Sequence, residues 1–117
     1  MQRGQMKASV VVALLALPVQ VMAQDWQPVP DEAGVRATLE GRKLTYDSGA
    51  WQDFRASGKT LYNSGRDSWG NWRAQGAQYC SQWPPAGDWA CYDLLTSGDK
   101  VRFVGAGGDV TDGTYTD

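Results

Sequence analysis

Few residues in this chain could do chemistry. It has no histidine, two cysteines and six tryptophans among 117 residues. The absence of histidine excludes Ser-His-Asp and Cys-His nucleophilic catalysis. A carboxylate pair could still hydrolyse glycosides, and Asp47, Asp53 and Asp67 are candidates by residue type. Two of the three lie among turn residues, and a chain this small leaves little room for a substrate cleft. We therefore expect no catalytic residues, no cofactor and no enzyme activity.

Metal ligands are also scarce. Two thiols without histidine do not complete an ordinary zinc site. Asp109-Val-Thr-Asp112-Gly113 has the oxygen-rich, glycine-containing character of a calcium loop, but its spacing fits no calcium motif. A hairpin turn explains this stretch better, and we expect no metal.

Cys80 and Cys91 are the only cysteines. In an oxidising compartment an even pair in a small domain predicts one disulfide. If two strands pair through the loop Pro84–Gly87 with Cys80 opposite Cys91, then Tyr79 faces Tyr92. Alternation then puts Cys80 on the solvated side and Tyr79 on the core side.

The same register extends to the rest of this hairpin, with Ser81 facing Ala90 and Gln82 facing Trp89. Trp83, Ala90, Tyr92 and Leu94 then share the core side with Tyr79. Gln78, Gln82, Trp89 and Asp93 share the solvated side with Cys80.

Three tryptophans have polar neighbours on their own strand faces. Trp51 alternates with Asp53 and Arg55, Trp69 with Asn71 and Arg73, and Trp89 lies on the polar side of the cysteine hairpin. Exposed aromatic rings beside amides and carboxylates suit sugar stacking or a protein interface. We predict a candidate binding face of Trp51, Trp69 and Trp89. The alternative is that these rings pack in the core or cover a barrel end.

Residues 1–23 predict the compartment. Arg3 and Lys7 precede an apolar run, and Val21-Met22-Ala23 suits a signal peptidase. The run is short for a transmembrane helix, which needs about 20 apolar residues. We expect a signal peptide cleaved before Gln24 and a periplasmic or secreted protein without membrane insertion, the alternative being a retained anchor. Without Arg3 and Lys7, 9 basic residues face 13 acidic ones, a net charge of −4. This balance argues against nucleic acid and anionic membranes as partners.

The rest of the chain predicts one β-rich domain. Gln24–Pro30 contains two prolines and predicts an extended arm, and Asp31–Glu40 predicts a short helix with Val35 and Leu39 buried. Short runs separated by turn residues follow. The predicted strands are 43–46, 51–56, 60–62, 69–74, 78–83, 89–95, 100–104 and 110–115. We predict an all-β domain over 31–117, a small antiparallel meander or barrel of about seven to eight strands with one disulfide.

Two stretches carry family resemblances. Gly65 to Trp72 together with Tyr79 to Pro84 resembles uncharacterised small exported proteins of proteobacteria, which implies export and a single domain. Trp72-Arg-Ala-Gln-Gly76-Ala-Gln-Tyr-Cys80 is similar to a stretch of the β-barrel inhibitors of bacterial metalloproteases. In that family the partner cysteine lies upstream, whereas Cys91 lies downstream. The resemblance implies that the arm Gln24–Pro30 enters a protease cleft.

Three functions remain open. The leading hypothesis is a non-enzymatic binding module of the cell envelope, with an unknown protein or glycan partner. The second is an inhibitor of a secreted hydrolase. The third is a domain that only packs against envelope proteins.

Overall fold

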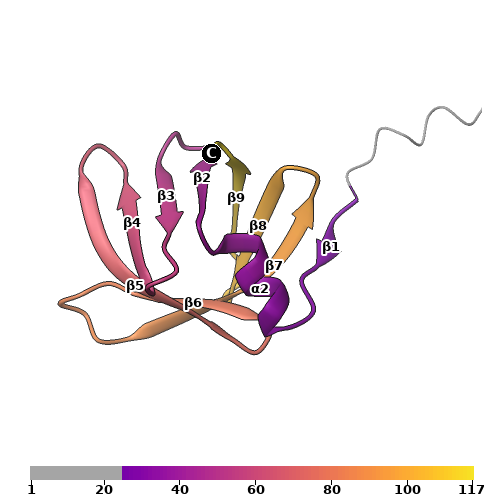
Figure 1. The fold of residues 1–117 in the computed structure, drawn as a ribbon, viewed down its shortest axis with the longest axis horizontal. Coiled ribbons are helices and arrows are strands. Elements are labelled where there is room, and N and C mark those ends of the chain that lie inside the picture. Colours follow the sequence, from indigo (N-terminus) through magenta and orange to yellow (C-terminus); the bar gives the residue numbers. More distant parts are fainter. Residues whose placement is uncertain (1–24) are drawn as a thin grey trace, which may run out of the picture.

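The computed structural model describes residues 25–117, so the predicted signal peptide lies outside the described residues. The predicted all-β fold is confirmed. Eight antiparallel strands close into a barrel, with one additional strand, one short helix and one disulfide (Figure 1).

Each predicted strand and the predicted helix overlap with one element of the structure. In chain order these are β1 (Gln27–Pro28), α2 (Glu32–Leu39), β2 (Arg42–Tyr46), β3 (Trp51–Phe54), β4 (Lys59–Asn63), β5 (Asp67–Gln75), β6 (Gln78–Gln82), β7 (Trp89–Ser97), β8 (Lys100–Gly105) and β9 (Val110–Tyr115). Only the two-residue strand β1 was predicted as an extended arm instead.

The barrel is an up-and-down meander. Each strand from β2 to β9 pairs with the next, and pairing of β2 with β9 closes the cycle. Turn residues permit the tight connections, and Gly49 (φ 97°) and Gly98 (φ 59°) occupy the left-handed backbone region that glycine adopts without strain. Closure leaves the eight strands with pairing partners on both sides along most of their length.

Helix α2 lies across one end of the barrel (Figure 1). Asp31 caps it, because its Oδ1 accepts a hydrogen bond from the Gly34 amide at 2.8 Å. Val35 and Leu39 are fully buried, as predicted from their spacing of four. The helix contacts β2, β5 and β6, which places it where β2 and β6 begin and β5 ends. We call this the helix end of the barrel.

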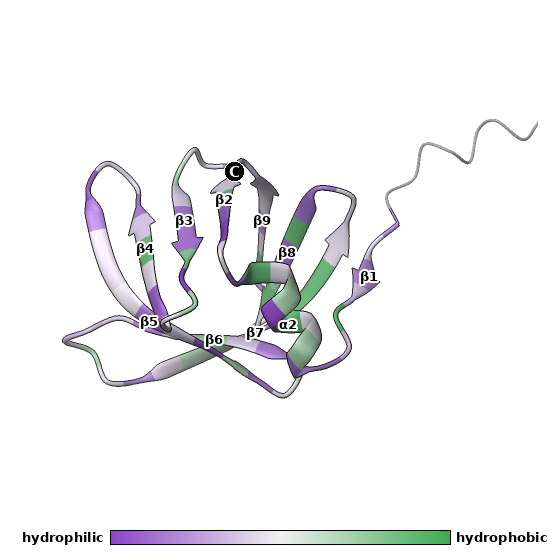
Figure 2. Ribbon diagram, in the orientation of Figure 1, coloured by the Kyte–Doolittle hydropathy of each residue, from purple (hydrophilic) through white to green (hydrophobic). Residues whose placement is uncertain are grey.

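Aromatic rings fill the interior next to the helix. Phe54 is fully buried and contacts Trp72, Tyr79 and Phe103, with ring centroids 5.9, 5.6 and 6.4 Å away. Hydrophobic residues of α2, β7 and β8 add to this core, as the green segments of Figure 2 show. The core therefore occupies the helix end and the middle of the barrel.

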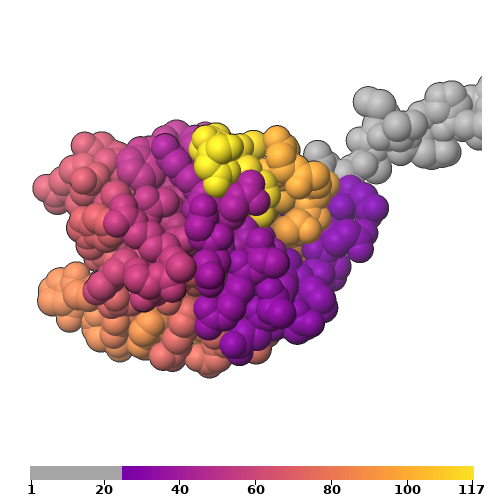
Figure 3. Space-filling model, in the orientation of Figure 1, coloured from indigo at the N-terminus to yellow at the C-terminus, as the bar shows by residue number. Residues whose placement is uncertain are grey.

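The C-terminal residues close the seam between the first and last barrel strands. Figure 3 shows them packed against N-terminal residues of the domain. Asp117 accepts two hydrogen bonds from the Arg42 guanidinium, at 3.0 and 3.2 Å. This pair holds the pKa of the Asp117 carboxyl below its usual value, with the Arg42 hydrogen bond as the largest cause.

Candidate functional site

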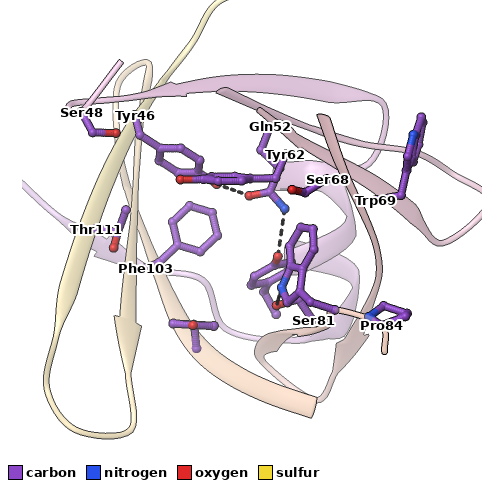
Figure 4. Close-up of a pocket in the computed structure, with 13 residues that line it drawn as sticks. Tyr46, Ser48, Gln52, Tyr62, Ser68, Trp69, Ser81, Pro84, Phe103 and Thr111 are labelled. Carbon is purple, nitrogen blue, oxygen red and sulfur yellow. Dashed lines mark hydrogen bonds between the residues drawn. The ribbon is translucent and has the colours of Figure 1, made fainter. Parts of the chain in front are cut away.

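A cavity of about 600 Å³ lies at the end of the barrel away from α2 (Figure 4). We call it the mouth cavity. It lies where β2 and β4 end and where β5, β7 and β9 begin. Its lining consists of aromatic, hydroxyl-bearing and amide side chains and one proline. The lining residues are Tyr46, Ser48, Gln52, Tyr62, Ser68, Trp69, Tyr79, Ser81, Trp83, Pro84, Tyr92, Phe103 and Thr111.

The cavity exists because small residues face large ones across the strand pairs. Tyr62 lies opposite Ser68, and Phe103 lies opposite Thr111. Tyr92 likewise lies opposite Gly105. A barrel of eight strands has an interior that side chains can just fill or that can hold one small ligand. Pairing each ring with a small residue leaves the space unfilled at this end.

A buried amide forms part of the cavity wall. Gln52, 4% exposed, accepts a hydrogen bond from the Tyr46 hydroxyl through Oε1 at 2.5 Å. Its Nε2 donates to the Tyr79 hydroxyl at 3.1 Å (Figure 4). The same nitrogen donates to Thr60 Oγ1 at 2.9 Å. The Thr60 hydroxyl in turn donates to the Asp53 carbonyl at 2.6 Å. These bonds fix the amide and hold the Tyr46 and Tyr79 rings in place.

The two buried phenols stay neutral over the ordinary pH range. Burial raises the pKa of Tyr46 well above its usual value. Burial also raises the pKa of Tyr79 to about 12, although hydrogen bonds from Ser81 and Gln52 act in the opposite direction. The remaining lining residues have uncharged side chains at neutral pH, so the whole wall of the mouth cavity is uncharged.

The Tyr79 phenol predicts how stability changes in alkali. In the unfolded chain it loses its proton near pH 10, and in the folded chain near pH 12. The folded state therefore binds more protons between these values, and the free energy of unfolding falls as the pH rises. The slope from Tyr79 is at most about 1.4 kcal/mol per pH unit. We expect Tyr79→Phe to flatten the decline measured by urea unfolding between pH 10 and 12. An unchanged slope would contradict the assignment.

Trp83 covers part of the mouth. Its Nε1 donates to Ser81 Oγ at 3.1 Å, and its ring meets Tyr62 edge to face at a centroid distance of 6.1 Å. It lies directly over Gly70, where an added Cβ would come within 2.5 Å of the indole carbon Cε3. Glycine at position 70 is therefore what lets this ring fold inward. Sequence alternation placed Trp83 on the core side but did not reveal that it borders a cavity.

The three tryptophans of the predicted binding face lie on the outside of the barrel, each beneath a cation. Lys43 Nζ lies 4.5 Å from the Trp51 ring centroid, Arg55 Cζ 4.8 Å from that of Trp69, and Arg73 Cζ 3.9 Å from that of Trp89. Trp69 is 49% exposed, and the other two are half-buried. Cation–π contact explains why these rings have charged neighbours.

These tryptophans do not form one surface. They lie on β3, β5 and β7, and β3 and β7 are four strands apart in a cycle of eight. Trp51 and Trp89 are therefore on nearly opposite sides of the barrel, and the expected common face is absent. Alternation tells which residues point outward but not where around the barrel they lie. Trp69 alone borders the mouth cavity, where Figure 4 shows it standing apart from the other rings.

The predicted disulfide is confirmed, with Cys80 and Cys91 paired in register and their sulfurs 2.07 Å apart. The neighbouring pairs are also those expected, including Tyr79 opposite Tyr92, Ser81 opposite Ala90 and Gln82 opposite Trp89. Two burial predictions were wrong. Cys80 faces outward but is fully buried, because Arg73 lies opposite it and reaches across to Trp89. Ala90 faces inward but is exposed, because it lies at the open end of the barrel.

The candidate carboxylates lie outside the mouth cavity. Asp47 is exposed in a turn, and Asp53 pairs with Arg55 Nε at 3.5 Å. Asp67 accepts a hydrogen bond from Asn63 at 2.8 Å. Asp112 accepts hydrogen bonds from Arg102 Nε and Nη2, at 2.8 and 2.9 Å. No group of three or more potential metal ligands occurs among residues 25–117.

The described part of the N-terminal arm is attached to the barrel. Gln27 and Pro28 pair with Thr96 and Leu95 of β7, and the Val29 amide donates to the Leu94 carbonyl at 2.9 Å. Arg102 Cζ lies 4.2 Å from the Trp26 ring centroid. The arm is thus extended, as predicted, but from Trp26 onward its backbone and indole contact β7 and β8.

Comparison with known proteins adds no relative. No family model matches the chain, and no curated protein or solved structure matches it. The two resemblances to exported proteins and to protease inhibitors therefore stay predictions. Among residues 25–117 no helix has the length and apolar character needed to cross a membrane.

Proposed function

We propose that this chain is a non-catalytic binding module that acts outside the cytoplasm, and that the mouth cavity is its ligand site. The observation that carries the proposal is the cavity of about 600 Å³ inside a closed barrel. Sites for small ligands have volumes of about 300–1,000 Å³ and combine aromatic walls with a few polar groups. The wall described above has this composition.

The surroundings support a binding role. The buried core forms the floor of the cavity, because Tyr46, Tyr79 and Phe103 belong to both, whereas the hydroxyl-bearing residues Ser48, Ser68 and Thr111 line the cavity outside that core. The lining includes no carboxylate, imidazole or thiol that could act as acid, base or nucleophile. The disulfide Cys80–Cys91 and the predicted signal peptide favour the periplasm or the exterior, because disulfides persist in oxidising compartments.

A pair of tryptophan insertions on β9 tests the site. Thr111 points into the cavity, whereas its neighbour Val110 points outward and is 52% exposed. We expect Thr111→Trp to fill the cavity and weaken binding of small molecules at least tenfold. Val110→Trp, which adds the same ring outside, should bind as the parent does. Binding is followed by amide shifts of the ¹⁵N-labelled protein with neutral sugars and with indole.

Two results would contradict the assignment of the mouth cavity as the ligand site. If both insertions leave the amide shifts unchanged, the molecules bind elsewhere. If the parent protein responds to none of the molecules at millimolar concentration, the cavity is not a ligand site for them and the proposal fails. Thermal unfolding of both variants shows that each is folded.

An inhibitor of a secreted hydrolase is the second candidate, favoured by the order of arm, helix and barrel. The attached arm restricts this role, because Trp26 to Val29 would have to leave β7 and β8 to enter a cleft. We expect deletion of residues 24–30 to abolish any inhibition of a secreted metalloprotease. Inhibition that survives the deletion would exclude the arm as the inhibitory segment.

A further inference from the structure

We infer that the mouth cavity binds an uncharged, hydroxyl-rich ring, the chemistry of a neutral mono- or disaccharide unit; this rests on the proposed function and names its ligand class. Three features of the wall carry the inference. They are its lack of charge, its lack of branched aliphatic side chains, and its free hydroxyl groups next to aromatic faces.

The first feature excludes charged ligands. No lysine, arginine, aspartate or glutamate lines the cavity. Two ion pairs on the outside of the barrel, Arg55 with Asp53 and Arg102 with Asp112, also lie outside the lining. A charged ligand would lose its hydration without gaining an opposite charge, and this loss disfavours its binding.

The second feature disfavours alkyl chains. Pro84 is the only aliphatic residue in the lining, which contains no leucine, isoleucine, valine or methionine. A fatty chain would leave the wall's free hydroxyl groups without water and without partners. A ligand must therefore satisfy hydrogen bonds while packing against rings.

The third feature supplies those hydrogen bonds. The hydroxyls of Tyr62, Ser68, Tyr92 and Thr111 have no hydrogen-bond partner among residues 25–117. They come from β4, β5, β7 and β9 and so approach the cavity from different sides. A hydroxyl both donates and accepts, which matches the hydroxyls of a sugar.

The aromatic faces complete the match. Tyr62 and Trp83 meet edge to face at 6.1 Å, and Tyr92 and Phe103 do so at 6.4 Å. All four of these rings line the cavity and give it aromatic walls. The C–H groups of a sugar ring pack against aromatic faces and form weak, favourable contacts there.

The experiment compares matched probes by amide shifts of the ¹⁵N-labelled chain. Maltose and N-acetylglucosamine are the neutral sugars, glucuronate and glucosamine the charged ones, and indole the neutral aromatic. We expect the neutral sugars to shift lining residues, and the charged sugars to bind at least tenfold more weakly. Tyr62→Phe with Tyr92→Phe should weaken sugar binding at least fivefold and leave indole binding unchanged. Tyr115→Phe is the control, because its hydroxyl donates to the Thr38 carbonyl outside the cavity.

The outcomes separate the ligand class from the site. Indole binding without sugar binding would overturn the sugar class and leave the cavity as a ligand site. Equal binding of charged and neutral sugars would overturn the argument from charge. No binding of any probe would overturn both this inference and the proposed function. Equal losses in Tyr115→Phe and the double variant would show that the effect comes from stability and would contradict the role of the two hydroxyls.

Discussion

Replacing Phe54 with alanine is expected to lower the free energy of unfolding by about 3–5 kcal/mol, because the ring is fully buried and the space it leaves cannot close. Phe54 contacts Trp72, Tyr79 and Phe103. Two of these rings, Tyr79 and Phe103, also line the mouth cavity. The substitution therefore removes the layer that supports the cavity from below, and we expect ligand binding to weaken as well.

Urea unfolding followed by tryptophan fluorescence measures the loss. The matched control is Trp69→Ala, which removes a larger ring from the outside of the barrel, where it is 49% exposed. Because solvent already covers half of that ring, the control should cost much less than Phe54→Ala. Equal losses in the two variants would contradict the assignment of Phe54 to the core.

Removing the disulfide is expected to have the second largest effect. Cys80 and Cys91 are 11 residues apart, and closing a loop of this length stabilises the folded state by about 3 kcal/mol in the chain-entropy model. The test is the double variant Cys80→Ala with Cys91→Ala. Alanine is preferred to serine because position 80 is fully buried, and a serine hydroxyl there would be buried as well. Stabilities of small domains are about 5–15 kcal/mol, so this is a large share.

Reduction supplies the control for the disulfide variant. A thiol reductant should destabilise the parent protein by a similar amount and leave the double variant unaffected. The test is urea unfolding with and without dithiothreitol. A parent protein that is as stable when reduced as when oxidised would contradict the expected contribution.

The sequence predicted those features that depend on neighbouring strands. The cysteine pair and the loop between the two strands set the register of β6 and β7, so Tyr79 opposite Tyr92 followed from local geometry. Helix α2 followed in the same way from the Asp31 cap and the spacing of Val35 and Leu39. These interactions lie within about a dozen residues, where turn chemistry and alternation decide the structure.

Features that depend on barrel closure could not be predicted. Closure joins β2 to β9, which pairs Tyr46 with Gly113 across 67 residues of sequence. Only the pairing of β2 with β9 decides that Trp51 and Trp89 lie on nearly opposite sides of the barrel. It also decides which small residues meet which rings, as with Phe103 and Thr111. Interpreting the sequence one strand at a time therefore could not predict the mouth cavity.

The pairing of rings with small residues also has an evolutionary consequence. Ser68 and Thr111, which line the cavity opposite Tyr62 and Phe103, are exposed and lie outside the hydrophobic core. Selection can enlarge or shrink these two side chains with little effect on folding, because neither belongs to that core. The barrel thus has the properties of a scaffold whose cavity changes shape while its fold stays constant, and a combinatorial library at these positions is the direct way to select new binders from it.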